Sequence, residues 1–277
     1  MPQAPLDALA ASGVAEVHMV GRRGPSQARF TTKELRELGS LPDTEVTVDP
    51  AELALDPAYE DPSALPAPQR RNVEVLREWA SRTPGQAPRQ IRLDFYLRPV
   101  EILADDDRRV GAVRFERTVP DGRGGVTGTG EHVDIEAQLV LRSVGYRGVP
   151  LDGLPFDAVN GTVPNSAGRV LRDGSASPGE YVAGWIKRGP TGVIGSNRPC
   201  AKETVTSLLE DAPALAGKDV PEDPVAALRA AGAEPVEWGG WVAIEQAEAD
   251  LGARLGRGVV KLADWDSLLG AARSADA

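Results

Sequence analysis

The sequence predicts an α/β protein built around a doubly wound parallel sheet. Near the N-terminus, segments with helical spacing alternate with short apolar runs, in the order helix, strand, helix, strand. Between residues 91 and 144, apolar residues recur at every second position and glycine-rich turns follow, as in antiparallel hairpins. The 277 residues are 41% hydrophobic, which is enough for a folded core, and the length predicts one large domain or two small ones.

The N-terminal elements are a helix at 5–12, a buried strand at 14–21, a helix ending near residue 38 and a strand at 44–48. The first strand ends in the tight turn Gly21-Arg22-Arg23-Gly24-Pro25. Thr31 and Glu34 have the spacing of a capping box, which predicts that the second helix begins there.

Residues 49–68 contain five prolines and several acidic residues, so we expect an exposed connection with little regular structure. The later elements are a helix at 69–81, hairpin strands at 91–103, 110–119 and 132–144, a strand at 181–185, a loop at 187–197, a helix at 199–209 and a mostly helical tail from residue 220.

Composition and charge exclude several classes of protein. The net charge of −10 argues against nucleic acid as the main partner. No apolar run approaches the roughly 18 residues that a membrane span needs, and the N-terminus lacks the features of a signal peptide. One cysteine (Cys200) and two histidines (His18 and His132) rule out a disulfide framework and make a metal site unexpected. We therefore expect a cytoplasmic protein without a metal centre.

The turn Gly21–Pro25 is a candidate nucleotide site. We compare the strand before this turn with the second strand of a dinucleotide-binding sheet. At the end of that second strand, an acidic residue selects a free ribose 2′-hydroxyl, whereas arginine accommodates a 2′-phosphate. Arg22 and Arg23, on a turn fixed by Gly24 and Pro25, could contact such a phosphate bidentately. The alternative is an ordinary basic turn. The strand before it and the capped helix after it favour NADP(H) binding.

Residues 184–197 (GWIKRGPTGVIGSN) form a second candidate site. Gly189, Gly192 and Gly195 leave the backbone open to a ligand, and Ser196 or Asn197 could cap the following helix. Exposed amides at a helix N-terminus can bind a pyrophosphate, and Trp185 could lie against a flat ring. A glycine-rich loop with a core tryptophan explains the spacing equally well, so both interpretations stay open at this point.

Two long segments, VGRRGPSQARFTTKELREL and GWIKRGPTGVIGSNRPCAKETV, resemble the adrenodoxin reductase type of ferredoxin–NADP reductase, in its bacterial, FprA-like branch. The resemblance implies a glutathione-reductase-like flavoprotein fold with two dinucleotide-binding domains, and the cofactors FAD and NADP(H). It implies NADPH:ferredoxin oxidoreductase activity, with a ferredoxin-like iron–sulfur protein as partner. Residues 1–146 would be part of the NADP-binding domain, and 147–277 the C-terminal portion of the FAD-binding domain with a helical tail.

The resemblance also implies roles for residues in both segments. Arg22 and Arg23 would hold the 2′-phosphate, Glu34 would contact the nicotinamide nucleotide, and Glu37 would be the acid that pairs with a histidine near the flavin. The FAD-facing residues would be Trp185, Gly192, Val193 and Ile194, with Gly192 also touching the nicotinamide side.

One departure from the family pattern affects all of these expectations. The family opens with a Gly-x-Gly-x-x-Gly turn for FAD and has a second glycine-rich turn for NADP, and this sequence contains neither. Gly128-Thr129-Gly130 lies between alternating strands and is expected to be a hairpin turn. We therefore expect an incomplete, N-terminally truncated reductase with little activity alone, which would act only if the missing segment comes from another chain or an upstream reading frame. The alternative is a non-catalytic remnant that acts as a nucleotide-binding or interaction module.

Overall fold

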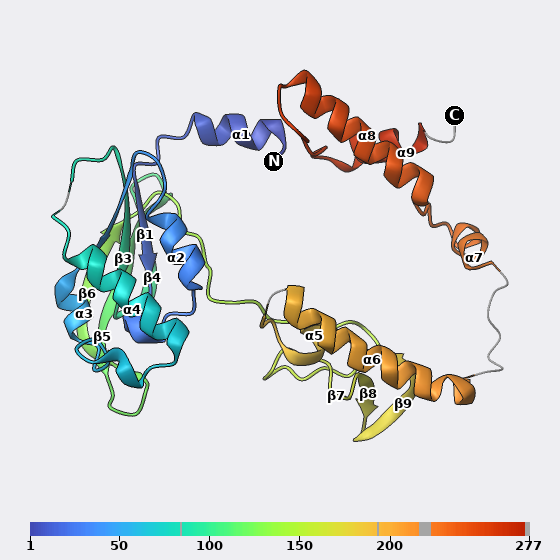
Figure 1. Cartoon of the computed structure of the whole chain (residues 1–277), viewed down its shortest axis with the longest axis horizontal. Coiled ribbons are helices and arrows are strands. Elements are labelled where there is room, and N and C mark those ends of the chain that lie inside the picture. Colours follow the sequence, from blue (N-terminus) through green and yellow to red (C-terminus); the bar gives the residue numbers. More distant parts are fainter. Residues whose placement is uncertain (84, 193, 216–222, 275–277) are drawn as a thin grey trace. The chain divides into compact units, whose positions relative to one another are not determined.

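The computed structural model describes residues 1–83, 85–192, 194–215 and 223–274 (Figure 1). The chain divides into two compact units, Met1–Leu141 and Arg142–Ala277, and each unit is described by itself.

Unit 1 contains the predicted parallel sheet. Its strands are β1 (Glu16–Val20), β2 (Thr44–Val48) and β3 (Arg89–Asp94), in the order β1-β3-β2, and β3 pairs parallel with both neighbours. Helices α2 (Thr32–Leu38), α3 (Pro50–Ala54) and α4 (Ala67–Ala80) follow β1 and β2 in the chain. Their buried side chains, among them Leu35, Leu53, Leu76 and Trp79, form one core with side chains of β2 and β3. The arginine turn begins after β1, where the N–H of Gly21 donates to the carbonyl of Asp94 at the end of β3 at 2.8 Å.

Local signals explain where these helices begin. Helix α1 (Gln3–Ala10) precedes the sheet, and α2 has the predicted capping box, in which Thr31 and Glu34 bond each other's backbone N–H groups. The expected irregular segment 49–68 is only partly irregular, because it contains α3 and the 3-10 turn η2 (Pro62–Ala64). Asp49 caps α3 and Pro50 occupies its first turn. This pair is a helix-start signal, although the number of prolines in the segment predicted irregular structure.

The expected strand 91–103 is in fact two strands that belong to different sheets. Strand β3 ends at Asp94, and the backbone turns at Tyr96, which has φ 57°. Strand β4 (Leu97–Ala104) then pairs antiparallel with β5 (Val110–Pro120), which pairs with β6 (Val126–Glu136). The third hairpin strand, predicted at 132–144, spans Val126–Glu136 instead, so Gly128-Thr129-Gly130 lies within this strand and is not the expected hairpin turn.

Unit 2 contains a small antiparallel sheet and a long helix. The strands are β7 (Asn165–Ser166), β8 (Arg169–Arg172) and β9 (Ser175–Tyr181), so the strand expected at 181–185 lies earlier. Helix α5 (Trp185–Arg188) follows, and α6 (Ile194–Leu215) begins before the expected start at residue 199, with Pro199 inside it. The tail is helical as predicted, in α7 (Pro224–Ala230), α8 (Trp238–Arg254) and α9 (Trp265–Arg273).

Within the described ranges, no helix has both the length and the apolar character needed to cross a bilayer. The same residues contain no group of three or more His, Cys, Asp or Glu side chains placed to hold a metal ion.

Glu52 on α3 is a half-buried carboxyl group behind the end of β3. Its Oε2 atom accepts a hydrogen bond of 2.7 Å from the backbone N–H of Phe95. Burial raises the pKa of Glu52 from its ordinary value of 4.5 to about 7, and this bond only partly opposes the shift. The folded chain therefore holds the Glu52 proton more tightly than the unfolded chain does.

This pKa predicts a specific pH dependence of stability. The contribution of Glu52 is fully present below pH 4.5 and is lost as the pH rises through about 7. Glu52→Gln keeps an oxygen acceptor for Phe95 and cannot titrate. Between pH 4.5 and about 7, the free energy of unfolding of this variant should therefore fall by about 1 kcal/mol less than that of the wild type, after solvent screening. Urea unfolding across this pH range measures the difference. The exposed α4 residue provides the control Glu74→Gln, and equal pH slopes in the two variants would contradict the prediction.

Candidate functional site

The arginine turn follows β1 directly. Arg22 is exposed and Arg23 is half-buried. Within the described part of the chain, neither guanidinium forms an ion pair with a carboxylate, whereas Arg98, Arg114 and Arg169 all do. Two unpaired cations on adjacent residues are therefore free to bind an anion.

The backbone after the arginines is tightly packed. Gly24 and Pro25 are buried, and a Cβ atom on Gly24 would collide with the hydroxyl group of Tyr96 and lie 2.6 Å from Oδ2 of Asp56. Burial, and then the nearby Asp56 carboxylate, raise the pKa of the Tyr96 phenol above its ordinary value, so the phenol stays neutral. Asp56 also accepts hydrogen bonds from the N–H and the hydroxyl of Ser26, at 2.8 and 3.0 Å. Glycine is thus the residue that this turn can hold at position 24.

The two carboxylates predicted on α2 have different surroundings. Glu34 accepts hydrogen bonds from the N–H (2.9 Å) and the hydroxyl (2.8 Å) of Thr31, and these bonds lower the pKa of Glu34. The Glu34 carboxylate therefore caps the N-terminus of its own helix. Glu37 is 61% exposed, and its carboxylate lies 3.7 Å from the Nζ atom of Lys33.

Neither histidine is a described partner of Glu37. His18 lies on β1 and its Nδ1 atom is 2.7 Å from Oδ2 of Asp94, while Nε2 is 3.2 Å from Glu16. His132 is on β6, opposite Glu116 of β5.

A groove of about 700 Å³ lies along α2 and the first turns of α4. The hydroxyl of Thr32 donates to Oδ1 of Asn72 at 2.7 Å, which ties the two helices together. Glu37 lines the groove with Arg36 and Arg71, and neither of these guanidiniums has a carboxylate partner among the described residues. The other lining residues are Thr32, Lys33, Ser40 and Glu74.

In unit 2, positive φ angles at glycines shape the second predicted site. Gly184 (φ 70°) and Gly189 (φ 88°) bound α5, and Gly192 (φ 85°) lies just before α6. No heavy atom lies within 4 Å of a Cβ built on Gly184 or Gly189, so backbone conformation and not crowding accounts for glycine there. Val193 lies outside the described residues, and Ile194 is the first residue of α6.

Trp185 is the first residue of α5 and is 44% exposed. Its ring lies against that of Tyr146, with centroids 5.6 Å apart and planes inclined by 31°. The predicted ring-binding residue is therefore part of an aromatic pair that solvent can reach, and not a core tryptophan.

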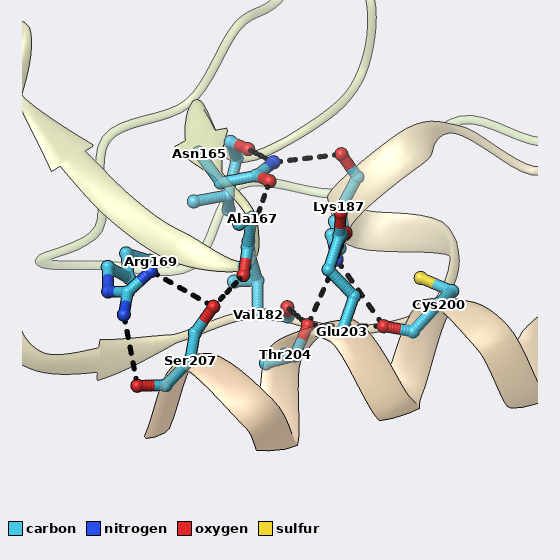
Figure 2. Close-up of polar contacts among 11 residues, drawn as sticks. Asn165, Ala167, Arg169, Val182, Lys187, Cys200, Glu203, Thr204 and Ser207 are labelled. Carbon is cyan, nitrogen blue, oxygen red and sulfur yellow. Dashed lines mark hydrogen bonds and ion pairs between the residues drawn. The ribbon is translucent and has the colours of Figure 1, made fainter. Parts of the chain in front are cut away.

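Buried polar contacts hold α5 against α6 (Figure 2). The Lys187 side chain is only 8% exposed, and its Nζ atom donates to the carbonyl of Cys200 (3.3 Å), to the hydroxyl of Thr204 (3.1 Å) and to the carboxylate of Glu203. Asn165 donates to the carbonyl of Lys187 at 2.9 Å. These contacts fix the backbone that carries Trp185.

The hydroxyl of Thr204 also donates to the carbonyl of Val182 at 2.9 Å. Arg188 closes the following loop through Thr191 and Asn197, and its Nε atom is buried without a hydrogen-bond partner in the described structure. Sequence reasoning did not single out Asn165 or Thr204, because their partners lie on distant segments and leave no local pattern.

The two units have the features of a flavoprotein with two dinucleotide-binding domains. One carries an arginine turn after a parallel strand, and the other carries a glycine-rich loop before a long helix. A solved structure described as FprA of Mycobacterium tuberculosis in complex with NADPH matches the chain with a TM-score of 0.86 and 42% identity, over 100% of this chain and 61% of that one. This match confirms the predicted fold class.

Curated relatives confirm the resemblance to the adrenodoxin reductase type of ferredoxin–NADP reductase. The NADPH-ferredoxin reductase FprA of Mycobacterium tuberculosis (strain ATCC 25618 / H37Rv) is 44% identical over 276 residues, which is 95% of this chain and 59% of the relative. The mitochondrial NADPH:adrenodoxin oxidoreductase of Arabidopsis thaliana is 35% identical over 285 residues, 96% of this chain and 59% of the relative. No protein-family model matches the chain. The chain thus spans about three fifths of the length of these relatives.

The Lys187 contacts predict a local effect on stability. Lys187→Met keeps much of the side-chain volume and removes the buried donor, so the protection of backbone amides in α5 and the first turns of α6 should fall by about 1–3 kcal/mol. Glu203 is the exposed partner, so Glu203→Gln should cost less than about 1 kcal/mol. Hydrogen exchange measured by mass spectrometry resolves both segments. Wild-type protection of α5 in Lys187→Met would show that the lysine does not hold this helix in place.

Proposed function

We propose that this chain carries the NADP-contacting and flavin-facing parts of an NADPH:ferredoxin oxidoreductase. FAD held by the flavin-facing residues would supply the acceptor for the NADPH hydride and the carrier of electrons to a ferredoxin. The observation that carries the proposal is the pair of unpaired guanidiniums, Arg22 and Arg23, at the carboxyl end of β1. Arginine at this place in a dinucleotide-binding sheet suits a 2′-phosphate and does not suit a free 2′-hydroxyl.

The remaining site assignments follow from the resemblance. Glu34 would contact the nicotinamide nucleotide and Glu37 would be the acid near the flavin, within an NADP-contacting part at 1–146. The capping role of Glu34 implies that any contact with the nucleotide uses a carboxylate already held by Thr31.

The flavin-facing part would be residues 147–277, with Trp185, Gly192, Val193 and Ile194 toward the cofactor. Three features of the described residues suit a flat, anionic cofactor. The glycines allow close approach of the backbone, Trp185 offers a half-exposed ring face, and Arg188 has a buried N–H without a partner.

The proposed partner is a ferredoxin-like iron–sulfur protein in the cytoplasm. Ferredoxins are generally acidic, and the groove along α2 and α4 presents the unpaired guanidiniums of Arg36 and Arg71. A separate chain that supplies the remaining flavin-binding segment is also part of the proposal.

The 2′-phosphate assignment predicts a ligand preference of the 277-residue chain. It should bind adenosine 2′,5′-bisphosphate more tightly than adenosine 5′-monophosphate. Arg22→Ala combined with Arg23→Ala should reduce affinity for the bisphosphate by at least about 100-fold, because each charge-assisted contact contributes about 1.5 kcal/mol or more. Isothermal titration calorimetry measures both ligands without any need for flavin or turnover.

Arg29→Ala is the matched control, since Arg29 is an exposed arginine just beyond the turn. This variant should keep the wild-type preference. A wild-type chain that does not distinguish the two ligands, or a double variant that retains the preference, would refute the assignment.

Activity separates a reductase from a nucleotide-binding module. We expect NADPH-dependent ferredoxin reduction when the chain is co-expressed with a polypeptide equivalent to the part of the relatives that it does not match. Without that polypeptide, little turnover is expected. Ligand preference without turnover in the co-expressed preparation would leave the binding module as the function.

A further inference from the structure

The backbone of the arginine turn is held at successive carbonyl groups by segments far away in the chain. The carbonyl of Arg22 accepts a hydrogen bond of 2.9 Å from the hydroxyl of Thr118, a residue of β5. The next carbonyl, that of Arg23, accepts from the backbone N–H of Tyr96 at 3.4 Å. The peptide between the two arginines is therefore fixed by a side chain that is almost fully buried.

Thr118 is suited to this task because it is almost fully buried and anchored on both sides. It is 1% exposed, and its own N–H donates to the carbonyl of Tyr96 at 2.8 Å. Within β5 it pairs with Gly128 of β6, next to an irregularity in the strand register that follows Glu116. A buried hydroxyl needs a partner, and the Arg22 carbonyl is the acceptor that this one has.

The turn is also fixed on its far side. Asp56 is 4% exposed and binds the N–H and hydroxyl of Ser26, and Gly24 packs against Asp56 and Tyr96. With both flanks held, the direction in which the two guanidiniums leave the backbone depends on the orientation of the Arg22 peptide.

We propose that Thr118 is a positioning residue for recognition of the adenosine 2′-phosphate. The inference rests on the proposed function, since it assigns to Thr118 the alignment of the arginines that are to bind this phosphate. Bidentate contacts require the guanidinium planes to be aimed at the phosphate oxygens. When the Arg22 carbonyl is released, the peptide can rotate, and a small rotation displaces the end of a long side chain.

The test measures the ratio of affinities for adenosine 2′,5′-bisphosphate and adenosine 5′-monophosphate in the 277-residue chain. Thr118→Val has nearly the same shape and no hydroxyl, so the ratio should fall by about tenfold, the equivalent of one lost hydrogen bond. Affinity for the monophosphate should stay at the wild-type value. Thr118→Ser restores the hydroxyl and should restore the ratio.

Thr129→Val is the matched control. Thr129 is on β6 of the same hairpin, and its hydroxyl donates to the carbonyl of Arg117 at 3.0 Å, away from the turn. The control should keep the wild-type ratio. Thr118→Cys covers the case in which the valine variant does not fold, because a thiol is a weaker donor and should give an intermediate ratio.

The outcomes distinguish this inference from the proposed function. If the wild type prefers the bisphosphate and the Arg22/Arg23 double variant loses that preference, but Thr118→Val and Thr118→Cys keep it, the positioning role is wrong and the arginine assignment stands. If the wild type shows no preference, both are wrong. Loss of preference in Thr118→Val, with rescue by Thr118→Ser and no effect of Thr129→Val, supports the positioning role.

Discussion

At Tyr96 the backbone takes a left-handed conformation, with φ 57°, which costs a non-glycine residue about 1 kcal/mol. The bend converts the parallel strand β3 into the antiparallel strand β4, so the same run of chain serves two sheets. The cost is offset because the Tyr96 ring is buried in the main core. In addition, the N–H of Tyr96 donates a hydrogen bond to the carbonyl of Arg23, and the carbonyl of Tyr96 accepts one from the N–H of Thr118. Sheet, hairpin and arginine turn therefore depend on this single conformation.

The two units use the same physical device to hold a loop in place. In unit 1 the buried hydroxyl of Thr118 donates to a carbonyl of the arginine turn. In unit 2 the buried hydroxyls of Thr204 and Ser207, both on α6, donate to the carbonyls of Val182 and Ala167 (Figure 2). A hydroxyl that bridges two segments satisfies a loop carbonyl without needing a strand partner, so the outer face of the loop stays available.

The sequence was informative wherever the determining residues are neighbours in the chain. The capping box of Thr31 and Glu34, strands β1 and β2 and the arginine turn follow from short-range patterns, and all of them are present. The burial predicted for the first strand is wrong, because β1 lies at the edge of the sheet and its Val17 and Met19 are 43% and 42% exposed. The bend at Tyr96 carries no glycine or proline, so residues 91–103 looked like one alternating strand. The helix after Asp49 was missed because its prolines suggested a loop, although Asp49-Pro50 is a helix-start signal.

The candidate sites divide in the same way. Arg22, Arg23 and Trp185 could be named from local patterns, because adjacent arginines and glycine-bounded loops are visible in a linear sequence. Thr118, Asp56 and Asn165 could not, since each acts on a segment that only folding brings near. Nothing in their immediate neighbours distinguishes them from ordinary strand or loop residues.

The way in which the arginine turn is tethered bears on how nucleotide preference can change during evolution or by engineering. A transplanted pair of arginines would bring the charges into another sheet without the hydroxyl, the phenol and the carboxylate that contact the turn in this chain. These supports come from β5, from the bend before β4 and from the segment after α3. Under the proposed function, exchange of cofactor preference in this fold is therefore a change of scaffold as much as of side chains, and substitutions at 22 and 23 alone would change only the charge.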